Sequence, residues 1–305
     1  MTDPRTAATA PLLELTDLAV QLPTGRRSSV DAVRRVNLRV ERGERVGIVG
    51  ESGSGKSVTG RAIAGLLPEN PRVQVQGSIR FNGREMNGAD QRAWQEIRTR
   101  RVGMIFQDPL TYLNPVMKIG RQVEEAIPAG GASESRRRES LRFLQLAGLT
   151  DVEQLAHRFP HELSGGMRQR VLVAIAIAKT PDLIIADEPT TALDATVQAL
   201  VLATLDETVR TLGTSLILIS HDLAVVAGMT DRLYVMYAGR IVESGPTAEV
   251  MAEPRHPYTQ ALLRSVRSLV DDDVELYSIP PAFRDWLRTE GAGLEFTTTT
   301  QDGAR

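Results

Sequence analysis

The fold of this chain is decided by the stretch Gly50-Glu51-Ser52-Gly53-Ser54-Gly55-Lys56-Ser57. A glycine, four residues and then Gly-Lys-Ser make the pattern of a phosphate-binding P-loop. Its glycines let successive backbone N–H groups curl toward an anion, and the start of the following helix adds partial positive charge. The motif predicts that residues from Gly50 to Val58 bind the phosphates of a nucleoside triphosphate. Lys56 is expected to reach the β- and γ-phosphates, and the Ser57 hydroxyl to face Mg²⁺.

The residues on either side of this loop have the pattern that the motif requires. Residues 45–49 are an apolar, β-branched run typical of a buried strand. Residues 58–67 predict a helix with Ile63, Leu66 and Leu67 on one apolar stripe and Pro68 as its stop. A chance match in a glycine-rich turn is the alternative, and the flanking strand and helix argue against it. The P-loop by itself does not identify the class of nucleotide-binding protein.

Composition limits the kinds of site and partner that the chain can have. A net charge of −2 offers no electrostatic argument for nucleic-acid binding. The sequence has no cysteine, which excludes disulfides and thiolate metal sites. No apolar run is long enough to span a bilayer, and residues 1–10 lack the apolar core of a signal peptide. We therefore expect a protein that stays on the cytoplasmic side.

The remaining pattern predicts an α/β fold of the P-loop NTPase kind. Strands are expected at residues 12–22, 35–40, 77–83, 102–106, 183–186 and 214–220, with a hairpin at 232–237 and 241–244. Helices are expected at 89–100, 164–179, 195–211 and 259–269, with a charged helical insert at about 119–158. The β-rich opening indicates a mixed sheet core with an N-terminal antiparallel region, rather than a simple doubly wound sheet.

Three regions follow from these predictions. Residues 1–10 are expected to be a flexible tail, and 11–250 a nucleotide-binding domain with a helical subdomain at about 118–165. Residues 251–305 are expected to be a short C-terminal extension in which Thr297-Thr298-Thr299-Thr300 is unstructured. The acidic run at 271–273 is interpreted as a solvated linker rather than a cation site.

Further motifs resemble those of the ATP-binding cassette (ABC) ATPases. The LSGGQ signature of that family is matched closely by Leu163-Ser164-Gly165-Gly166-Met167, and its D-loop by Ala192-Leu193-Asp194. Residues 183–188, which end in Asp187 and Glu188, resemble the Walker B strand, while Gln107 resembles the Q-loop glutamine and His221 the switch histidine. The order and spacing agree over about residues 12–250. The resemblance implies an ATPase with ATP and Mg²⁺ as its cofactors.

Each of these residues has the chemistry that its place in the family implies. Asp187 can hold Mg²⁺ through water and complete the shell that Ser57 begins. Glu188 can act as a general base or orient the attacking water, and His221 can donate to the charge that develops on the transferred phosphoryl group. Gln107 can bind Mg²⁺ or the attacking water, and it lies at the root of the helical insert, whose movement it could couple to the nucleotide.

The signature supplies a second anion-binding end, because Ser164-Gly165-Gly166 begins a helix. In the ABC family this end docks on the γ-phosphate that the opposite subunit holds. Plainer interpretations exist for each motif alone: an ordinary acidic pair at 187–188, a helix start with Ser164 as its N-cap, and a structural histidine at 221. His157 and His161 are interpreted as surface or packing residues without a role.

Three other stretches resemble the oligopeptide/dipeptide importer subfamily. They are residues 106–115, residues 160–163 and the run that begins His256-Pro257-Tyr258. The resemblance implies uptake of short peptides, or in relatives nickel chelates, glutathione or oligosaccharides. It also implies a second, paralogous ATPase subunit, two membrane permeases and an extracytoplasmic solute-binding protein, with this chain peripheral on the cytoplasmic face of the membrane. Residues 110–115 and 121–125 would lie near the coupling helices of the permeases.

Two departures from the subfamily affect its predicted cofactors. Many members carry a C-terminal cysteine cluster, whereas this chain has Ile279-Pro280-Pro281 there and no cysteine, so we expect no iron–sulfur cluster. ABC ATPases usually stack adenine on an aromatic residue before the P-loop, but no aromatic residue precedes Phe81. Val30 or a neighbour would take that place, or the guanidinium of Arg26 or Arg27 could stack on the base instead.

Three other functions are compatible with a P-loop. ABC ATPases that act on DNA have a long coiled coil, and those that act on ribosomes have two cassettes, neither of which this chain has. A P-loop kinase or GTPase is a second rival, but the Asn-Lys-x-Asp motif of GTPases is excluded because the only lysines are Lys56, Lys118 and Lys179. A degenerate regulatory subunit is a third, and the intact Asp187, Glu188 and His221 argue against it.

Overall fold

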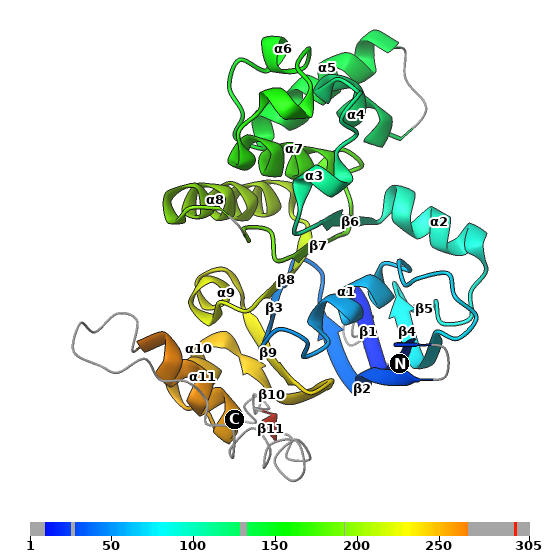
Figure 1. Cartoon of the computed structure of the whole chain (residues 1–305), viewed down its shortest axis with the longest axis vertical. Helices are drawn as coiled ribbons and strands as arrows, with labels where there is room; N and C mark the ends of the chain where they lie inside the picture. Colours follow the sequence, from blue (N-terminus) through cyan, green and yellow to red (C-terminus); the bar gives the residue numbers. More distant parts are fainter. Residues whose placement is uncertain (1–9, 26–27, 129–132, 192, 268–295, 298–305) are drawn as a thin grey trace, which may run out of the picture.

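The computed structural model describes residues 10–25, 28–128, 133–191, 193–267 and 296–297, and Figure 1 shows how their elements are arranged. Within this part of the chain, a four-stranded antiparallel sheet has the order β2 (Ser29–Val40), β1 (Leu13–Pro23), β4 (Gln74–Phe81) and β5 (Arg84–Glu85). A seven-stranded sheet has the order β11 (Phe296–Thr297), β10 (Arg240–Pro246), β9 (Arg232–Tyr237), β3 (Arg45–Val49), β8 (Ser215–Ser220), β7 (Leu183–Asp187) and β6 (Val102–Ile105). The predicted mixed sheet with an N-terminal antiparallel region is confirmed.

The middle of the larger sheet is parallel, and its strands are buried except for single partly buried residues in β3, β6 and β9. Valine, isoleucine and leucine make up ten of the sixteen residues of β3, β7 and β8, as expected for strands that are covered on both faces. Val49 pairs with Ser220, and Asp187 with Ile219, in parallel register. Because the carboxyl ends of neighbouring parallel strands meet at one edge, residues that follow β3, β7 and β8 are brought together there.

The helices are α1 (Lys56–Ile63), α2 (Gln91–Arg100), α3 (Pro109–Tyr112), α4 (Ile119–Ala126), α5 (Ser133–Leu146), α6 (Val152–Leu155), α7 (Gly165–Ile177), α8 (Ala195–Leu212), α9 (Leu223–Met229), α10 (Thr247–Ala252) and α11 (Pro257–Arg267), with a 3₁₀ turn at Pro160–Glu162. In Figure 1, α4, α5 and α6 lie together at the top of the molecule above α7, at the opposite end from β1 and β2. None of the described helices has the length and apolar character of a membrane span.

Two apolar clusters form the core. One joins the helices at the top to the sheet, with Val123 of α4 and Leu144 of α5 packed in the same cluster as Val171 of α7. The other lies between the antiparallel sheet and the opposite face of the larger sheet, and includes Leu15 of β1 and Ile48 of β3. Val49 of β3 belongs to the first cluster, so the P-loop strand contributes to both.

Several element boundaries differ from the predictions. The helix after the P-loop ends at Ile63 rather than at residue 67. Gly65 has φ 63°, and a Cβ there would lie 2.3 Å from Cε3 of Trp94, so the chain leaves the helix at a glycine packed on that ring. Strand β2 begins at Ser29, six residues before the predicted start, and the short helix α9 was not predicted.

The C-terminal residues also differ from the predictions. Thr297, predicted to be unstructured, lies in β11, where Phe296 and Thr297 pair in parallel with Glu243 and Ser244 of β10. This prediction was wrong because composition does not reveal that an edge strand offers unpaired backbone groups. Residues 298–300, the tail at 1–9, the acidic run at 271–273 and the Ile279-Pro280-Pro281 segment lie outside the described residues.

Candidate functional site

The P-loop follows β3 and leads directly into α1, as the motif requires. Gly53 and Gly55 have φ values of 80° and 106°, in the region that favours glycine. A Cβ at Gly50 would lie 2.1 Å from the carbonyl oxygen of Met236, and one at Gly55 would lie 2.3 Å from that of Ala32. Two of the motif's glycines are therefore required by the close approach of β9 and β2 to the loop.

The loop contains a polar group without a partner. The Ser54 side chain is buried, and among the described residues its Oγ has no hydrogen-bond partner. The backbone of the same residue is held from outside the loop, because the Gly239 amide donates to the Ser54 carbonyl at 2.9 Å. A buried hydroxyl that lacks an acceptor, in a loop whose curvature only glycine permits, fits the binding of an anion such as a phosphate group.

Lys56 lies inside this loop. Its side chain is buried, and its Nζ donates to the carbonyl oxygens of Gly50 at 2.7 Å and Glu51 at 2.9 Å. Burial lowers the pKa of Lys56, while the nearby carboxylates of Glu188 and Asp187 act in the opposite direction. The ammonium group is thus held against the loop backbone and close to the acidic residues that follow β7.

Ser57 and Asp187 form a second pair. The Ser57 hydroxyl donates to Oδ1 of Asp187 at 2.7 Å, and burial raises the pKa of Asp187 while this hydrogen bond lowers it. The described residues contain no cluster of three or more His, Cys, Asp or Glu side chains that could hold a metal ion. A hydroxyl beside one carboxylate suits Mg²⁺, which takes few protein ligands and completes its shell with water and phosphate oxygens.

Glu188 and His221 meet at the same edge of the sheet. Oε2 of Glu188 lies 2.9 Å from Nδ1 of His221 and accepts a hydrogen bond from the Thr191 hydroxyl at 2.8 Å. The Glu188 side chain is 15% exposed and that of His221 61% exposed. Glu188 has φ 48°, and its amide donates to the Ile219 carbonyl at 2.9 Å. Left-handed backbone at such a residue costs on the order of 1–3 kcal/mol and is characteristic of functional sites.

Gln107 stands apart from these pairs. Gln107 follows β6, and because Ile105 of β6 pairs with Ala186 of β7, it lies at the same edge of the sheet. Its side chain is exposed and makes no hydrogen bond within the described residues. The residue before it is held by the signature helix, since the buried Gln169 donates through Nε2 to the Phe106 carbonyl at 3.2 Å. The role of Gln107 as a Mg²⁺ or water ligand stays a prediction.

The signature residues form a unit with the D-loop. Ser164 is the N-cap of α7, as one interpretation of the sequence has it, and its Oγ accepts from the Met167 amide at 3.3 Å; the helix, predicted to run to Lys179, ends at Ile177. Asp194 caps α8 in the same way, accepting from the Val197 amide at 2.9 Å. A Cβ at Gly166 would lie 2.3 Å from Cγ1 of Val197, so α7 needs a glycine there to approach α8.

The signature lies away from the P-loop of its own chain. Leu163 is buried in the cluster below α4 and α5, and Gly165 packs beside Leu193. Of the hydrogen bonds found between described residues, none joins residues 163–167 to residues 50–58. Figure 1 shows α7 beneath the helices at the top and α1 beside β3 and β1.

One residue at the P-loop was missed by sequence reasoning. The hydroxyl of Tyr258, at the start of α11, accepts a hydrogen bond from the Glu51 amide at 2.8 Å. The sequence singled out His256-Pro257-Tyr258 for its resemblance to a subfamily and gave it no role in the site. The one indication of a role in the sequence is that this motif lies outside the predicted nucleotide-binding domain, where no predicted function accounts for it.

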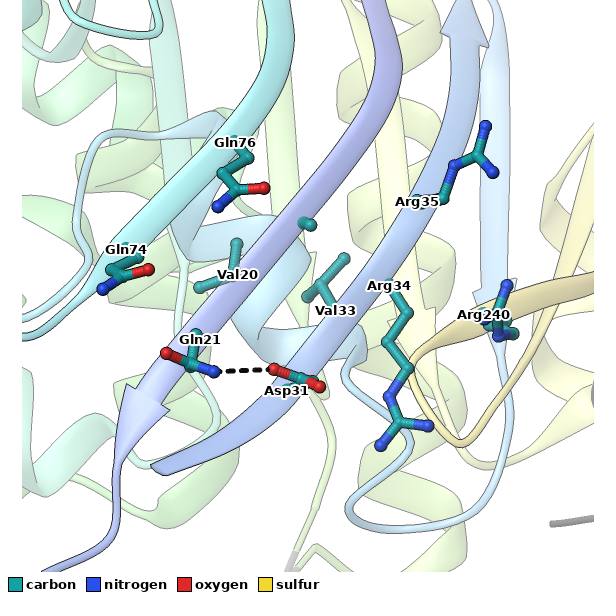
Figure 2. A pocket seen from close by; sticks show the side chains of 10 residues that line it. Val20, Gln21, Asp31, Val33, Arg34, Arg35, Gln74, Gln76 and Arg240 are labelled. Atoms are coloured by element: carbon teal, nitrogen blue, oxygen red, sulfur yellow. Dashed lines mark hydrogen bonds between the residues drawn. The ribbon is translucent and has the colours of Figure 1, made fainter. Parts of the chain in front are cut away.

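Two of the hollows that the described residues form are lined by none of these pairs. One, of about 370 Å³, is formed by β1, β2, β4 and the start of β10. Figure 2 shows it with Gln21 donating to Asp31 at 2.9 Å and with Arg34 and Arg240 at one side. A larger cleft, of about 660 Å³, lies between α2 and β6 on one side and α4 and α5 on the other, and is lined by residues such as Phe106, Glu125 and Lys179. Burial lowers the pKa of Lys179 to about 8.

Comparison with known proteins gave consistent results. Residues 33–191 match the ABC transporter family, and residues 242–296 match the C-terminal region of oligopeptide/dipeptide transporters. The oligopeptide transport ATP-binding protein OppD of Bacillus subtilis is 46% identical over 272 residues, which cover 88% of this chain and 76% of that protein. OppD of Mycobacterium bovis is 49% identical over 264 residues, which cover 85% of this chain but only 42% of that protein.

Solved structures include similar folds. A dimeric ATP-binding cassette in a post-hydrolysis state, bound to ADP and Pi, superimposes with a TM-score of 0.68 at 28% identity. The match covers 77% of this chain and 98% of that cassette.

Proposed function

The chain belongs to the ABC transporter family, in the branch of the oligopeptide and dipeptide transport ATP-binding proteins, and we propose that its ATP hydrolysis powers uptake of short peptides through partner permeases. One observation carries the catalytic part of this proposal. Lys56, the Ser57–Asp187 pair and the Glu188–His221 pair gather where three neighbouring parallel strands end. The relatives named above are peptide transport ATP-binding proteins, and they do not favour the alternatives of an ATPase acting on nucleic acid or the ribosome, or of a P-loop kinase.

The chain's own residues have separate tasks in hydrolysis. The backbone N–H groups of the P-loop and the Lys56 ammonium would bind and orient the phosphates of ATP. Ser57 would hold Mg²⁺ directly and Asp187 through water, with Gln107 as a further candidate ligand. When bound, the cation neutralises charge that develops on the β- and γ-phosphate oxygens.

Glu188 is proposed to take the proton of the attacking water. Thr191 and His221 both contact Oε2 of this carboxylate, which fixes its orientation and leaves Oε1 for the water. His221 would then donate a hydrogen bond to the transferred phosphoryl group. The contact between His221 and Glu188 supports this assignment, because the Glu188 carboxylate also lies near enough to the P-loop lysine to oppose the lowering of its pKa by burial.

A second ATPase subunit is part of the proposal. The signature lies away from the P-loop of its own chain, and the similar solved cassette is dimeric. Both observations support a composite site in which Ser164, Gly165 and Gly166 close on the ATP held by a partner. We propose that this partner is a paralogous subunit, as the subfamily resemblance implies.

The permeases are proposed to dock at the cleft of about 660 Å³. Glu125, which lines it, belongs to one of the two segments that the resemblance places near the coupling helices, and Phe106, which also lines it, leads into the other. The segment between β6 and α4 exposes apolar side chains, and Val116 within it is 82% exposed. Such a surface is typical of an interaction site and supports a peripheral position on the cytoplasmic face of the membrane.

Purification of the full chain from solubilised membranes tests these partners. We expect two multi-span permeases and a second ATPase subunit to be retained with it. We also expect ATP hydrolysis by the complex to rise when the extracytoplasmic solute-binding protein and peptide are added. Recovery of the chain with ribosomes or DNA, and without permeases, would contradict the proposal.

Adenine recognition gives a separate prediction. Val30 lies on β2 and is 44% exposed, so its place offers an aliphatic surface to the base rather than an aromatic ring. Loss of an aromatic partner removes stacking worth about 1 kcal/mol. We expect the dissociation constants of ATP and GTP to differ by less than about fivefold in a calorimetric titration, and Val30→Tyr to tighten ATP binding about fivefold.

A strong base preference would contradict this prediction. Wild-type binding of ATP more than about a hundredfold tighter than GTP would require a base-specific contact that the prediction leaves out.

A further inference from the structure

The start of α11 is fixed by buried polar contacts. Glu243 of β10 is 1% exposed, and its carboxylate accepts hydrogen bonds from the Arg255 amide at 2.7 Å and the His256 amide at 3.1 Å. Nδ1 of the buried His256 accepts from the Tyr258 amide at 3.0 Å, and Pro257 takes the first helical position. These contacts satisfy N–H groups that a helix start leaves without partners. The direction of the first turn of α11 is thereby set.

This geometry directs Tyr258 at the P-loop. Tyr258 is fully buried, its hydroxyl accepts from the Glu51 amide at 2.8 Å, and its ring packs on Tyr237 with the ring centres 4.6 Å apart. Tyr237 ends β9, two residues before Gly239, whose amide donates to the Ser54 carbonyl. The P-loop is therefore held at two backbone positions by groups from the C-terminal part of the chain.

Glu51 links the Tyr258 hydroxyl to Lys56. The Glu51 N–H donates to the Tyr258 hydroxyl, and the Glu51 carbonyl oxygen accepts from Nζ of Lys56 at 2.9 Å. One residue thus links the two side chains through its own peptide groups. A shift of Glu51 would move a backbone oxygen on which the Lys56 ammonium rests, inside the loop that binds phosphate.

We propose that Tyr258 is a positioning residue for the P-loop, through which the segment from β10 to α11 sets the affinity of the site for phosphate groups. The inference rests on the proposed function, because it takes the P-loop to be the ATP site. Tyr258 is not assigned a contact with ATP. Its effect passes through the Glu51 peptide group, so it should be felt at the phosphates and not at the base.

Two tyrosine variants of the full chain test this proposal. Tyr258→Phe removes the hydroxyl that contacts Glu51. Tyr234→Phe is the matched control, because the Tyr234 hydroxyl is also buried against backbone, accepting from the Arg39 amide at 3.1 Å and donating to the Arg39 carbonyl at 3.3 Å. We expect both variants to lower the thermal midpoint alike. Only Tyr258→Phe should weaken binding of ATP and of inorganic tripolyphosphate, each by about tenfold.

The two probes separate positioning from other effects. Binding of both ligands by Tyr258→Phe within twofold of wild type would overturn the inference, as would a loss for ATP without a loss for tripolyphosphate. Glu243→Gln tests the same path from its other end, since an amide cannot accept from both Arg255 and His256 as the carboxylate does. We expect a loss of about threefold for both ligands, and no loss would count against the inference.

A lysine variant distinguishes failure of this inference from failure of the proposed function. Lys56→Ala should bind neither ligand with wild-type affinity if the P-loop is the phosphate site. Normal binding by Lys56→Ala would refute the assigned site, and with it the role of Tyr258. Loss of binding in Lys56→Ala with unchanged binding in Tyr258→Phe would refute only the role of Tyr258.

Discussion

Replacement of Glu188 by glutamine is expected to lower steady-state ATP hydrolysis by about a hundredfold or more, while ATP affinity stays within about threefold of wild type. Glutamine has the shape of glutamate and can still accept the hydrogen bond of the Thr191 hydroxyl, but it cannot take a proton from water. Glutamine can take the left-handed backbone conformation at position 188 as glutamate does, so we expect the variant to keep the wild-type fold. Release of phosphate measured at saturating ATP, beside calorimetric binding, separates the two effects.

Glu96→Gln is the matched control for this variant. Glu96 lies on α2 and pairs with Arg84 at 3.4 Å, with both side chains more than half exposed. We expect wild-type turnover, because exposed ion pairs contribute little and Glu96 belongs to none of the residue pairs that form the site. Wild-type turnover in Glu188→Gln itself would refute the role of Glu188 as the general base.

Replacement of Lys56 by alanine should have its large effect on binding instead. Lys56 is the lysine of the P-loop, and the charge-assisted contacts that its ammonium group can make to phosphate are worth about 1.5–3 kcal/mol each. We expect ATP affinity to fall by about a hundredfold, and hydrolysis to be lost at ATP concentrations that saturate the wild type. Titration with ATP measures the first effect, and titration with tripolyphosphate should show an equal loss.

Lys118→Ala controls for the removal of a lysine as such. Lys118 precedes α4 and is exposed, so its loss should leave ATP affinity unchanged. A similar loss of affinity in both variants would mean that net charge, rather than the position of Lys56 in the loop, governs binding.

Much of the fold and site could be predicted because it depends on short-range pattern. The P-loop joins a strand and a helix that are its neighbours in sequence, and the parallel strands carry continuous apolar runs. Asp187, Glu188 and His221 follow two such strands, and parallel pairing brings their ends to one edge whatever lies between them. The contacts of Ser57 with Asp187 and of Glu188 with His221 follow from that rule.

The features that could not be predicted depend on contacts between distant segments. Tyr258 meets Glu51 across 207 positions of sequence, and no periodicity in either segment indicates the contact. The end of α1 is set by the Trp94 ring against Gly65, and the strand at Thr297 by an open edge on β10. Glutamate rarely adopts the left-handed backbone conformation that Glu188 has. Residue propensities therefore predict a different conformation from the one found in the site.

ATP-driven peptide uptake tests the central claim most directly. The measurement uses proteoliposomes that contain the complex purified through this chain, the solute-binding protein, and a labelled mixture of di- and tripeptides. We expect the wild-type complex to accumulate peptide only when ATP and Mg²⁺ are supplied, and the Glu188→Gln complex to bind ATP yet accumulate almost none. Uptake by the Glu188→Gln complex at the wild-type rate would contradict the claim that hydrolysis at this site powers transport.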